Sequence, residues 1–458
     1  MIDTPYGSFP DDYNLNSLED LCVKKIGIQT GPFGSQLHNS DYVSVGTPIL
    51  TVEHLGENRI LHENLPRVTE EDRQRLIRYS IKKGDIIFSR VGSVDRRALV
   101  RDDEEDWLFS GRCLRVRPNP EKLDSIFLSY LMGLPTFQEY VRKIAVGATM
   151  PSINTKILSS IPICYPPLPT QHAIARILGS LDDKIELNRQ MNETLEAMAR
   201  AISQSWFVDF DPVRAKAEGR QPAGMDAETA ALFPDGFEEV DGRDVPRGWG
   251  VATLGDFIEV VKGLSYKGEG LCDDGIPMHN LNSVLEGGGY KYRGIKFYNG
   301  EYQERHIIHH GDVIVTNTEQ GFDFLLIGYP AIIPKFYGET GLFSHHTFRV
   351  RPLIDSPLTN HFIYYLLMSP AVREQVIGCT NGTTVNMMYM DGLITPQFVL
   401  PSPQLIKEFE KIVSPMFDLM ENYEQQSRTL AEIRDALLPK LMSGEVQVRS
   451  KDEDKNLT

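Results

Sequence analysis

The chain has 458 residues, 41% of them hydrophobic and 24% charged, which is enough for two to four domains with cores of their own. It contains no apolar run of the roughly 20 residues that a membrane-spanning helix needs, and no export signal at Met1–Thr4. The five cysteines lie far apart, without zinc-site spacing, so we expect reduced thiols in a cytoplasmic protein. The formal net charge of −16 opposes nucleic-acid binding unless the acidic residues lie away from the binding surface.

The chain is a tandem repeat with an offset of about 235 residues. The segment Gly84–Ile87 recurs, with one conservative change, as Gly311–Ile314, and Arg115–Pro118 recurs as Arg349–Pro352. Other short matches follow in the same order, which chance would not produce. The sequence therefore predicts two copies of one fold.

Each copy begins with a lobe of about 150 residues, in which short β-branched runs alternate with glycine and proline. Asp85–Arg90 and Asp312–Thr316 are examples of these runs, which are typical of short strands bounded by turns. We expect short helices at about 124–133 and 358–368. Each lobe is therefore predicted to mix strands and helices.

A proline-rich hinge follows each lobe, and beyond it the apolar residues recur with the 3.5-residue period of a coiled coil. This pattern predicts two long helices, at 169–207 and 403–445, that pair antiparallel if a two-fold axis relates the copies. Asn188 and Asn192 fall on the predicted seam, where they would set the register. The alternative is ordinary helices within one compact bundle. The residues predicted for the seam and for subunit docking are Ile174, Leu178, Leu181, Ile185, Leu195, Ile202, Phe409, Val413, Met416, Met420, Leu430 and Leu437.

Between the first helix and the second lobe, residues 208–246 carry ten acidic and four basic side chains, and we interpret them as an acidic linker. More than a third of the acidic excess lies there, so the lobes are closer to neutral. The predicted fold class is α+β: two mixed α/β lobes joined by two long antiparallel coiled-coil helices in a pseudo-two-fold tandem repeat. The predicted divisions are a first lobe at 1–168, a helix at 169–207, the linker at 208–246, a second lobe at 247–402, a helix at 403–445 and a charged tail at 446–458.

The sequence lacks the motifs of common nucleotide-using and DNA-modifying enzymes. It has no Gly-x-x-x-x-Gly-Lys-Ser/Thr loop, no amino-methyltransferase tetrapeptide and no nuclease carboxylate pattern with usable spacing. Histidines at 306–310 and 345–346 could ligate a metal, but the first copy has Lys83 and the Arg112 neighbourhood at the matching positions. We therefore interpret these histidines as polar groups near strand ends or a DNA face, and we predict no metal and no catalytic residue.

Two lobes on a rigid spacer are suited to reading separated DNA sites. A helix of about 33 residues spans roughly 50 Å, which exceeds one turn of B-DNA. The first lobe has Arg90, Arg96 and Arg97 where the second has Asn317 and Gln320. Arginine pairs with guanine or phosphate, and asparagine or glutamine pairs with adenine, so the lobes are predicted to read different bases. The alternative for each arginine is a solvated surface charge.

Over nearly its whole length, the sequence resembles the specificity subunits of bacterial type I restriction-modification systems. The resemblance rests on the hinge Pro166–Gln171, the helix Ile174–Gln190, and the segments Ser205–Pro212, Val245–Trp249 and Gly84–Arg90. It implies that each lobe is a target-recognition domain for one half of an asymmetric bipartite DNA site. It also implies that the helices fix the gap between the half-sites.

The resemblance further implies partners and cofactors. Two modification (methyltransferase) subunits would dock on the helices and bind S-adenosylmethionine, and restriction subunits with translocase and endonuclease activity would use ATP and Mg²⁺. The chain itself would then be a non-catalytic subunit that needs no cofactor. We expect it in the cytoplasm, associated with the nucleoid.

By analogy, the base-reading groups lie in three loops of each lobe. The second lobe departs from the common family pattern, because Asn317–Gln320 replaces a Ser-Arg-Val-Gly run. The predicted DNA-binding residues are Gln36, Arg90, Ser93, Arg96, Arg97, Arg112, Thr149 and Asn154 in the first lobe, and Lys267, Asn317, Gln320, Thr384 and Asn386 in the second.

Two other functions remain as alternatives. The chain could be an enzyme with an unrecognised methyltransferase or nuclease site, which binding of S-adenosylmethionine by the isolated chain would indicate. It could also be an acidic DNA mimic or scaffold, which would spread its carboxylates over the lobes. The concentration of acidic residues at 208–246 favours the specificity-subunit interpretation.

Overall fold

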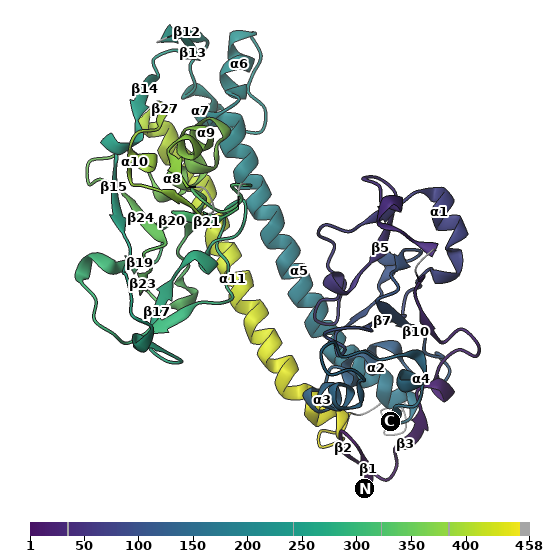
Figure 1. The fold of residues 1–458 in the computed structure, drawn as a ribbon. Coiled ribbons are helices and arrows are strands. Elements are labelled where there is room, and N and C mark those ends of the chain that lie inside the picture. The colour runs from purple at the N-terminus through teal and green to yellow at the C-terminus, as the bar shows by residue number, and fades with distance from the viewer. Residues whose placement is uncertain (34–35, 241, 322, 383–384, 449–458) are drawn as a thin grey trace, which may run out of the picture. The chain divides into compact units, whose positions relative to one another are not determined.

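A computed structural model describes residues 1–33, 36–240, 242–321, 323–382 and 385–448, and the chain divides into two compact units. The first comprises Met1–Glu186 and Ser427–Thr458, and the second Leu187–Gln426. Each unit contains one lobe and a part of the two long helices, α5 (Leu168–Phe207) and α11 (Pro403–Met442) (Figure 1). No helix among the described residues is long and apolar enough to cross a membrane.

The core of the first lobe is a four-stranded antiparallel sheet in the order β4-β10-β7-β8. Its strands are β4 (Ile28–Thr30), β7 (Ile86–Ser89), β8 (Arg97–Leu99) and β10 (Cys113–Val116). The remaining strands are β1 (Ile2–Thr4), β2 (Gly7–Phe9), β3 (Asn14–Ser17), β5 (Thr47–Leu50), β6 (Arg67–Val68), β9 (Leu108–Phe109) and β11 (Pro162–Tyr165). The helices are α1 (Glu70–Arg75), α2 (Ser125–Leu131), α3 (Pro135–Ile144) and α4 (Thr155–Ser159).

The second lobe repeats this sheet in the order β15-β24-β20-β22. Its strands are β15 (Ile258–Lys262), β20 (Val313–Thr316), β22 (Pro330–Ile332) and β24 (Thr347–Pro352). The other strands are β14 (Gly250–Thr253), β16 (Leu271–Cys272), β17 (Ile276–His279), β18 (Lys296–Tyr298), β19 (Ile307–His309), β21 (Thr318–Gln320), β23 (Thr340–Phe343), β25 (Thr380–Asn381), β26 (Val385–Met388) and β27 (Gln397–Leu400). The helices are α8 (Asn360–Met368), α9 (Pro370–Gly378) and α10 (Asp391–Ile394).

The recurring sequence motifs have the same structural role in both lobes. In the first lobe, Arg117 donates from Nε and Nη2 to the two carboxylate oxygens of the buried Asp85, at 2.7 and 2.6 Å. In the second, Arg351 donates in the same way to Asp312, at 2.5 Å for both bonds. Two-pronged pairs of this kind fix geometry as well as charge. The first joins the start of β7 to the end of its neighbour β10, and the second joins the start of β20 to the end of its neighbour β24. The predicted tandem repeat is confirmed.

The predicted antiparallel pairing of the long helices is also confirmed. In the second unit, the amide Nδ2 of Asn188 donates to the carbonyl of Tyr423 at 3.3 Å, and that of Asn192 donates to the carbonyl of Met420 at 3.2 Å. The contact residue on α11 thus moves backward as the residue on α5 moves forward. Both asparagines lie in the seam, where they bond the backbone of the opposite helix.

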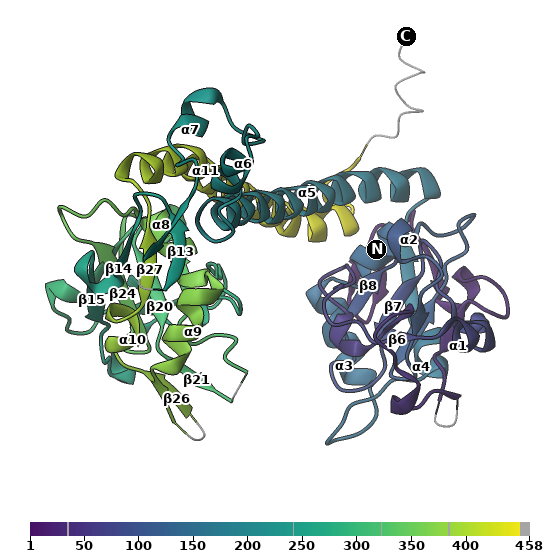
Figure 2. The same ribbon diagram turned by 90° about the horizontal axis from the view of Figure 1, so that it is seen from above.

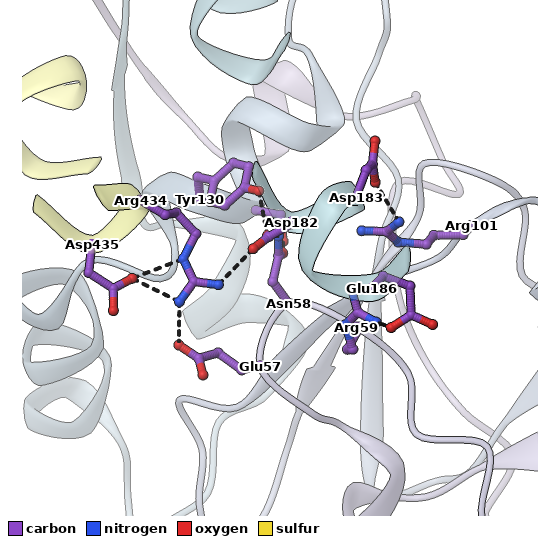
Figure 3. A network of polar contacts seen from close by, with 11 residues as sticks. Glu57, Asn58, Arg59, Arg101, Tyr130, Asp182, Asp183, Glu186, Arg434 and Asp435 are labelled. Atoms are coloured by element: carbon purple, nitrogen blue, oxygen red, sulfur yellow. Dashed lines mark hydrogen bonds and ion pairs between the residues drawn. The ribbon is translucent and has the colours of Figure 1, made fainter. Parts of the chain in front are cut away.

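In the first unit, a polar network joins α5, α11 and the lobe (Figure 3). Arg434 of α11 donates to Asp182 of α5 at 2.6 Å. Asp182 also accepts from the hydroxyl of Tyr130 at 2.5 Å and from Nδ2 of Asn58 at 3.4 Å. Asp182 is nearly buried, so its carboxylate depends on these donors for compensation.

The segment 208–246 is not the linker that its composition predicts. It forms α6 (Asp211–Ala217), α7 (Ala227–Ala231) and a hairpin of β12 (Phe237–Val240) and β13 (Arg243–Pro246). Val213 and Phe233 are buried in the core of the second unit, and the ring of Phe233 lies edge-on to Trp206. Burial of these apolar side chains favours a folded segment, and most of its acidic side chains remain exposed.

Candidate nucleic-acid interface

In the first lobe, Arg90 lies just after the central strand β7, beside Phe33, Arg112 and Ile153. Its backbone N–H donates to the carbonyl of Arg112 at 2.9 Å, and its own carbonyl accepts from Ile153 at 2.9 Å. Its guanidinium donates to the carbonyl of Gly111 at 3.1 Å and lies 4.5 Å from the ring centroid of Phe33. Phe33 is 48% exposed, so the lobe presents a cation on an accessible aromatic face.

The second lobe has the same backbone frame around Asn317, just after β20. The N–H of Asn317 donates to the carbonyl of His346 at 3.1 Å, and its carbonyl accepts from Met388 at 2.9 Å. The Asn317 side chain is 4% exposed, donates to the carbonyl of His345 at 3.1 Å and accepts from the hydroxyl of Thr318 at 2.8 Å. Asn317 therefore holds the loop together, and the prediction that it contacts adenine is corrected.

Positive charge gathers beside this frame, on what we call the second-lobe rim: Lys262, Tyr266, Lys296, His345 and His346. The Nζ of Lys296 donates to the Tyr266 hydroxyl at 2.8 Å and lies 5.2 Å from its ring centroid. The rings of His345 and His346 are 3.9 Å apart. Burial lowers the pKa of His346, and the charges of His345, Lys262 and Lys296 lower it further. The rim thus brings two lysines and two histidines together beside the frame, an arrangement suited to an anionic partner.

Sequence reasoning missed Phe33, Tyr266 and Lys296. Phe33 and Tyr266 could have been found, because each follows a glycine by two or three residues, and the two glycines pack against equivalent backbone carbonyls in their lobes. A Cβ on Gly31 would lie 2.2 Å from the carbonyl oxygen of Ser110, and a Cβ on Gly263 would lie 2.2 Å from that of Ser344. Lys296 has no such signal, because it comes from β18, which has no equivalent among the recurring motifs.

The remaining predicted residues fall into three groups. The first group is exposed, and its members stay predictions: Ser93, Arg112, Thr149, Asn154, Lys267 and Gln320. Asn154 also caps α4, where its Oδ1 accepts from the N–H of Ile157 at 2.9 Å. Gln320 lies on β21, which pairs with β26 in the second lobe (Figure 2).

The second group is half-buried and bonded within its own lobe. Oε1 of Gln36 accepts from the Tyr79 hydroxyl at 2.8 Å and from Arg78 at 3.2 Å. Arg96 donates to the carbonyl of Leu55. These contacts position both side chains, and their role in DNA binding stays a prediction.

The third group is buried, which corrects the prediction of DNA contact. Arg97 is 6% exposed, donates to the carbonyl of Ser129, and has its pKa lowered to about 10 by burial. Asn386 is also buried and donates to the carbonyl of Gly321. Asn386 lies on the inward face of β26, where buried and exposed side chains alternate. Arg97 lies on β8, all three residues of which are buried. Thr384 lies outside the described residues.

The twelve residues predicted for the seam and subunit docking are likewise directed inward. Ile174, Leu178, Leu195, Phe409 and Val413 are buried, and the other seven are partly buried. They pack within the molecule, as a seam requires, so they do not offer the free surface that another subunit would bind. The exposed apolar side chains of α5 are instead Leu187, Met191 and Met198.

Among the described residues, the side chains of His62, Asp103 and Glu104 lie close enough together to hold a metal ion. Both oxygens of Glu104 are already engaged: one is 2.9 Å from Nε2 of His62, and the other accepts from the N–H of Arg101 at 2.6 Å. These bonds close a turn, which explains the cluster without a metal.

Comparison with known proteins shows which family the chain is similar to. The family model described as type I restriction modification DNA specificity domain matches residues 10–197. The HindI type I specificity subunit of Haemophilus influenzae is 29% identical, over 85% of this chain and 92% of its own. The MjaIX specificity subunit of Methanocaldococcus jannaschii is 24% identical, over 97% and 96%. The crystal structure of the type I restriction-modification S subunit from M. genitalium has the same fold, with a TM-score of 0.56, 16% identity and coverage of 96% and 99%. Residues 10–197 thus match a type I restriction modification DNA specificity domain, and over most of its length the chain is similar to type I specificity subunits.

Proposed function

We propose that the chain recognises an asymmetric bipartite DNA sequence, with each lobe reading one half, and that it has no catalytic activity of its own. The supporting observation is that one backbone frame carries different side chains in the two lobes. Arg90 on Phe33 marks the first lobe, and Lys296 on Tyr266, beside His346, marks the second. Two domains that recognise different half-sites need the same backbone frame with different polar side chains on it.

The acidic net charge is compatible with this function. The rim of the second lobe brings lysines together, whereas more than a third of the net acidic excess lies on the segment 208–246. Modification subunits bound to the same DNA would supply further phosphate neutralisation.

We further propose that two modification subunits dock on the helices and carry S-adenosylmethionine. Restriction subunits with ATP and Mg²⁺ would join them on DNA in the cytoplasm, in association with the nucleoid. The candidate docking face in the second unit is formed by Leu187, Met191 and Met198 of α5. Spacings of four and seven residues put these three exposed side chains on one face of the helix, and exposed apolar groups of this kind favour a protein partner.

The test is genome-wide methylation mapping in cells that express the chain with its modification subunit, compared with cells that lack the chain. We expect one asymmetric, gapped motif that disappears without the chain. Replacing residues 1–165 with those of another specificity subunit should change one half of the motif only. A change in both halves would contradict the assignment of one half-site to each lobe.

A further inference from the structure

A cavity of about 510 Å³ lies in the second unit, between the helix pair and the lobe. Its aromatic lining consists of Tyr290, Tyr292, Tyr364 and Phe417. The volume falls within the range of small-molecule sites, and aromatic faces attract cations as well as apolar groups.

Carboxylates dominate the charged lining of this cavity. Four glutamates line it against two arginines: Glu193, Glu196, Glu421 and Glu424 against Arg189 and Arg200. Glu196 is compensated from within the chain, since it accepts from the hydroxyls of Tyr364 and Tyr365 at 3.2 and 3.3 Å and lies 3.6 Å from Arg200. Oε1 of Glu421 lies 3.2 Å from both Nε2 of His310 and the backbone nitrogen of Lys335.

Glu424 differs from these glutamates. It is half-buried, and no residue in the described part of the chain gives it a hydrogen bond or an ion pair. Burial raises the pKa of its carboxyl, against the opposing charge of Arg293. The pKa of Tyr292 is raised by burial and then by the charges of Glu421 and Glu424, so the negative charge lies beside an aromatic wall. A half-buried carboxylate of this kind is costly unless a cation accompanies it.

The first unit has a cavity of comparable volume, about 500 Å³, but there a carboxylate of the lining is bonded to a cation of the chain itself. There the carboxylate of Asp182 is paired with Arg434, which also lines the cavity (Figure 3). The first unit therefore pairs its carboxylate with a bonded cation, whereas among the described residues of the second unit Glu424 has the charge of Arg293 but no bonded cation.

We propose that the cavity of the second unit binds a small organic cation of the alkylamine class. Its ammonium group donates to Glu424, and its carbon chain lies against the rings of Tyr292 and Phe417. The amine binds without covalent chemistry, and its binding does not depend on DNA recognition.

Isothermal titration calorimetry of the full chain, without DNA, tests the proposal with putrescine and spermidine as probes and 1,4-butanediol as the neutral analogue of putrescine. We expect one saturable amine site per chain and no heat from the diol. Glu424→Gln keeps the shape of the side chain but removes its charge, and it should weaken amine binding at least tenfold. The matched control is Glu432→Gln, because Glu432 is an exposed residue of the same helix and does not line the cavity. The control also corrects for weak, non-specific amine binding to a chain of net charge −16.

Equal affinities in the two variants would overturn the proposal, as would binding of the diol as tight as that of the diamine. Circular dichroism of Glu424→Gln verifies that the variant is folded. As an independent readout, amine binding by the unaltered chain should weaken on acidification, because protonated Glu424 no longer attracts an ammonium group. A pH-independent affinity would likewise refute the assignment.

Discussion

The Arg434–Asp182 pair offers a sharp test of how the first lobe is held on the helices (Figure 3). Arg434 and Asp182 are only 12% and 7% exposed, and their nearest oxygen and nitrogen are 2.6 Å apart. Arg434→Met keeps much of the side chain's length and removes its charge. It leaves Asp182 charged and almost buried, which typically costs 3–5 kcal/mol.

The lower end of that range applies here. Tyr130 and Asn58 still donate to Asp182 in the variant, so part of its hydrogen bonding survives. We expect a loss of about 3 kcal/mol in the free energy of unfolding of the first unit. Asp182→Asn combined with Arg434→Met should be more stable than Arg434→Met alone, because no uncompensated charge is then buried.

Hydrogen exchange at increasing urea concentration measures this effect by region. Peptides from 168–186 and 427–442 report on the first unit, and peptides from 403–426 serve as the internal control. Arg428→Met is the matched variant, since Arg428 pairs with Glu432 on an exposed face, where such pairs contribute about 0.5 kcal/mol. Equal losses in Arg434→Met and Arg428→Met would refute the reasoning, as would a double variant no more stable than Arg434→Met.

Four further outcomes are expected. Arg90→Ala should weaken binding by about 1–3 kcal/mol for one half-site only, measured with DNA altered in either half; equal loss at both would mean that Arg90 contacts phosphate alone. Asn317→Ala should lower thermal stability, because it leaves the half-buried carbonyl of His345 without its donor, and an unchanged melting temperature would contradict this role. Lys296→Ala should reduce the slope of log affinity against log salt by about one if Lys296 contacts a phosphate, whereas an unchanged slope would remove it from the interface. Burial lowers the pKa of His279 to about 3, so on acidification this histidine is protonated in the unfolded chain before it is protonated in the folded chain. The free energy of unfolding should therefore fall by up to about 1.4 kcal/mol per pH unit below about pH 6.5. His279→Gln should flatten that dependence when urea unfolding is compared at pH 7.5 and 5.5.

The parts of the fold that were predictable from sequence are those where a local pattern has one structural solution. The recurring Gly-Asp and Arg-x-Arg-Pro motifs predicted a repeat because they come in the same order at a nearly constant offset. The structure adds the reason for their recurrence, since in each lobe the aspartate is buried and the arginine on the neighbouring strand bonds its carboxylate. The helix seam was predictable because its period differs from that of a strand. The folded state of 208–246 was missed because its composition is acidic, although a few apolar residues such as Val213 and Phe233 suffice to anchor it.

Site residues were harder to predict, because a polar side chain in a loop can point in either direction. Arg97 and Asn317 have the chemistry of base-reading groups, yet each bonds a carbonyl inside its lobe. Their direction follows from backbone acceptors on distant segments, the carbonyls of Ser129 and His345, which a single sequence does not reveal. Lys296 illustrates the converse, since its position on the rim depends on β18 lying beside the turn that carries Tyr266.

These placements indicate how the lobes can differ in specificity without losing stability. The pairs between a buried aspartate and a half-buried arginine fix the frame in both lobes, together with the backbone bonds around Arg90 and Asn317. The rim side chains lie outside that frame and make few of its bonds, so their replacement changes the charge and shape offered to DNA at little cost in folding energy. Substitutions at Phe33, Tyr266 and Lys296 should therefore alter recognition more than stability, whereas substitutions at Arg97 and Asn317 should do the reverse.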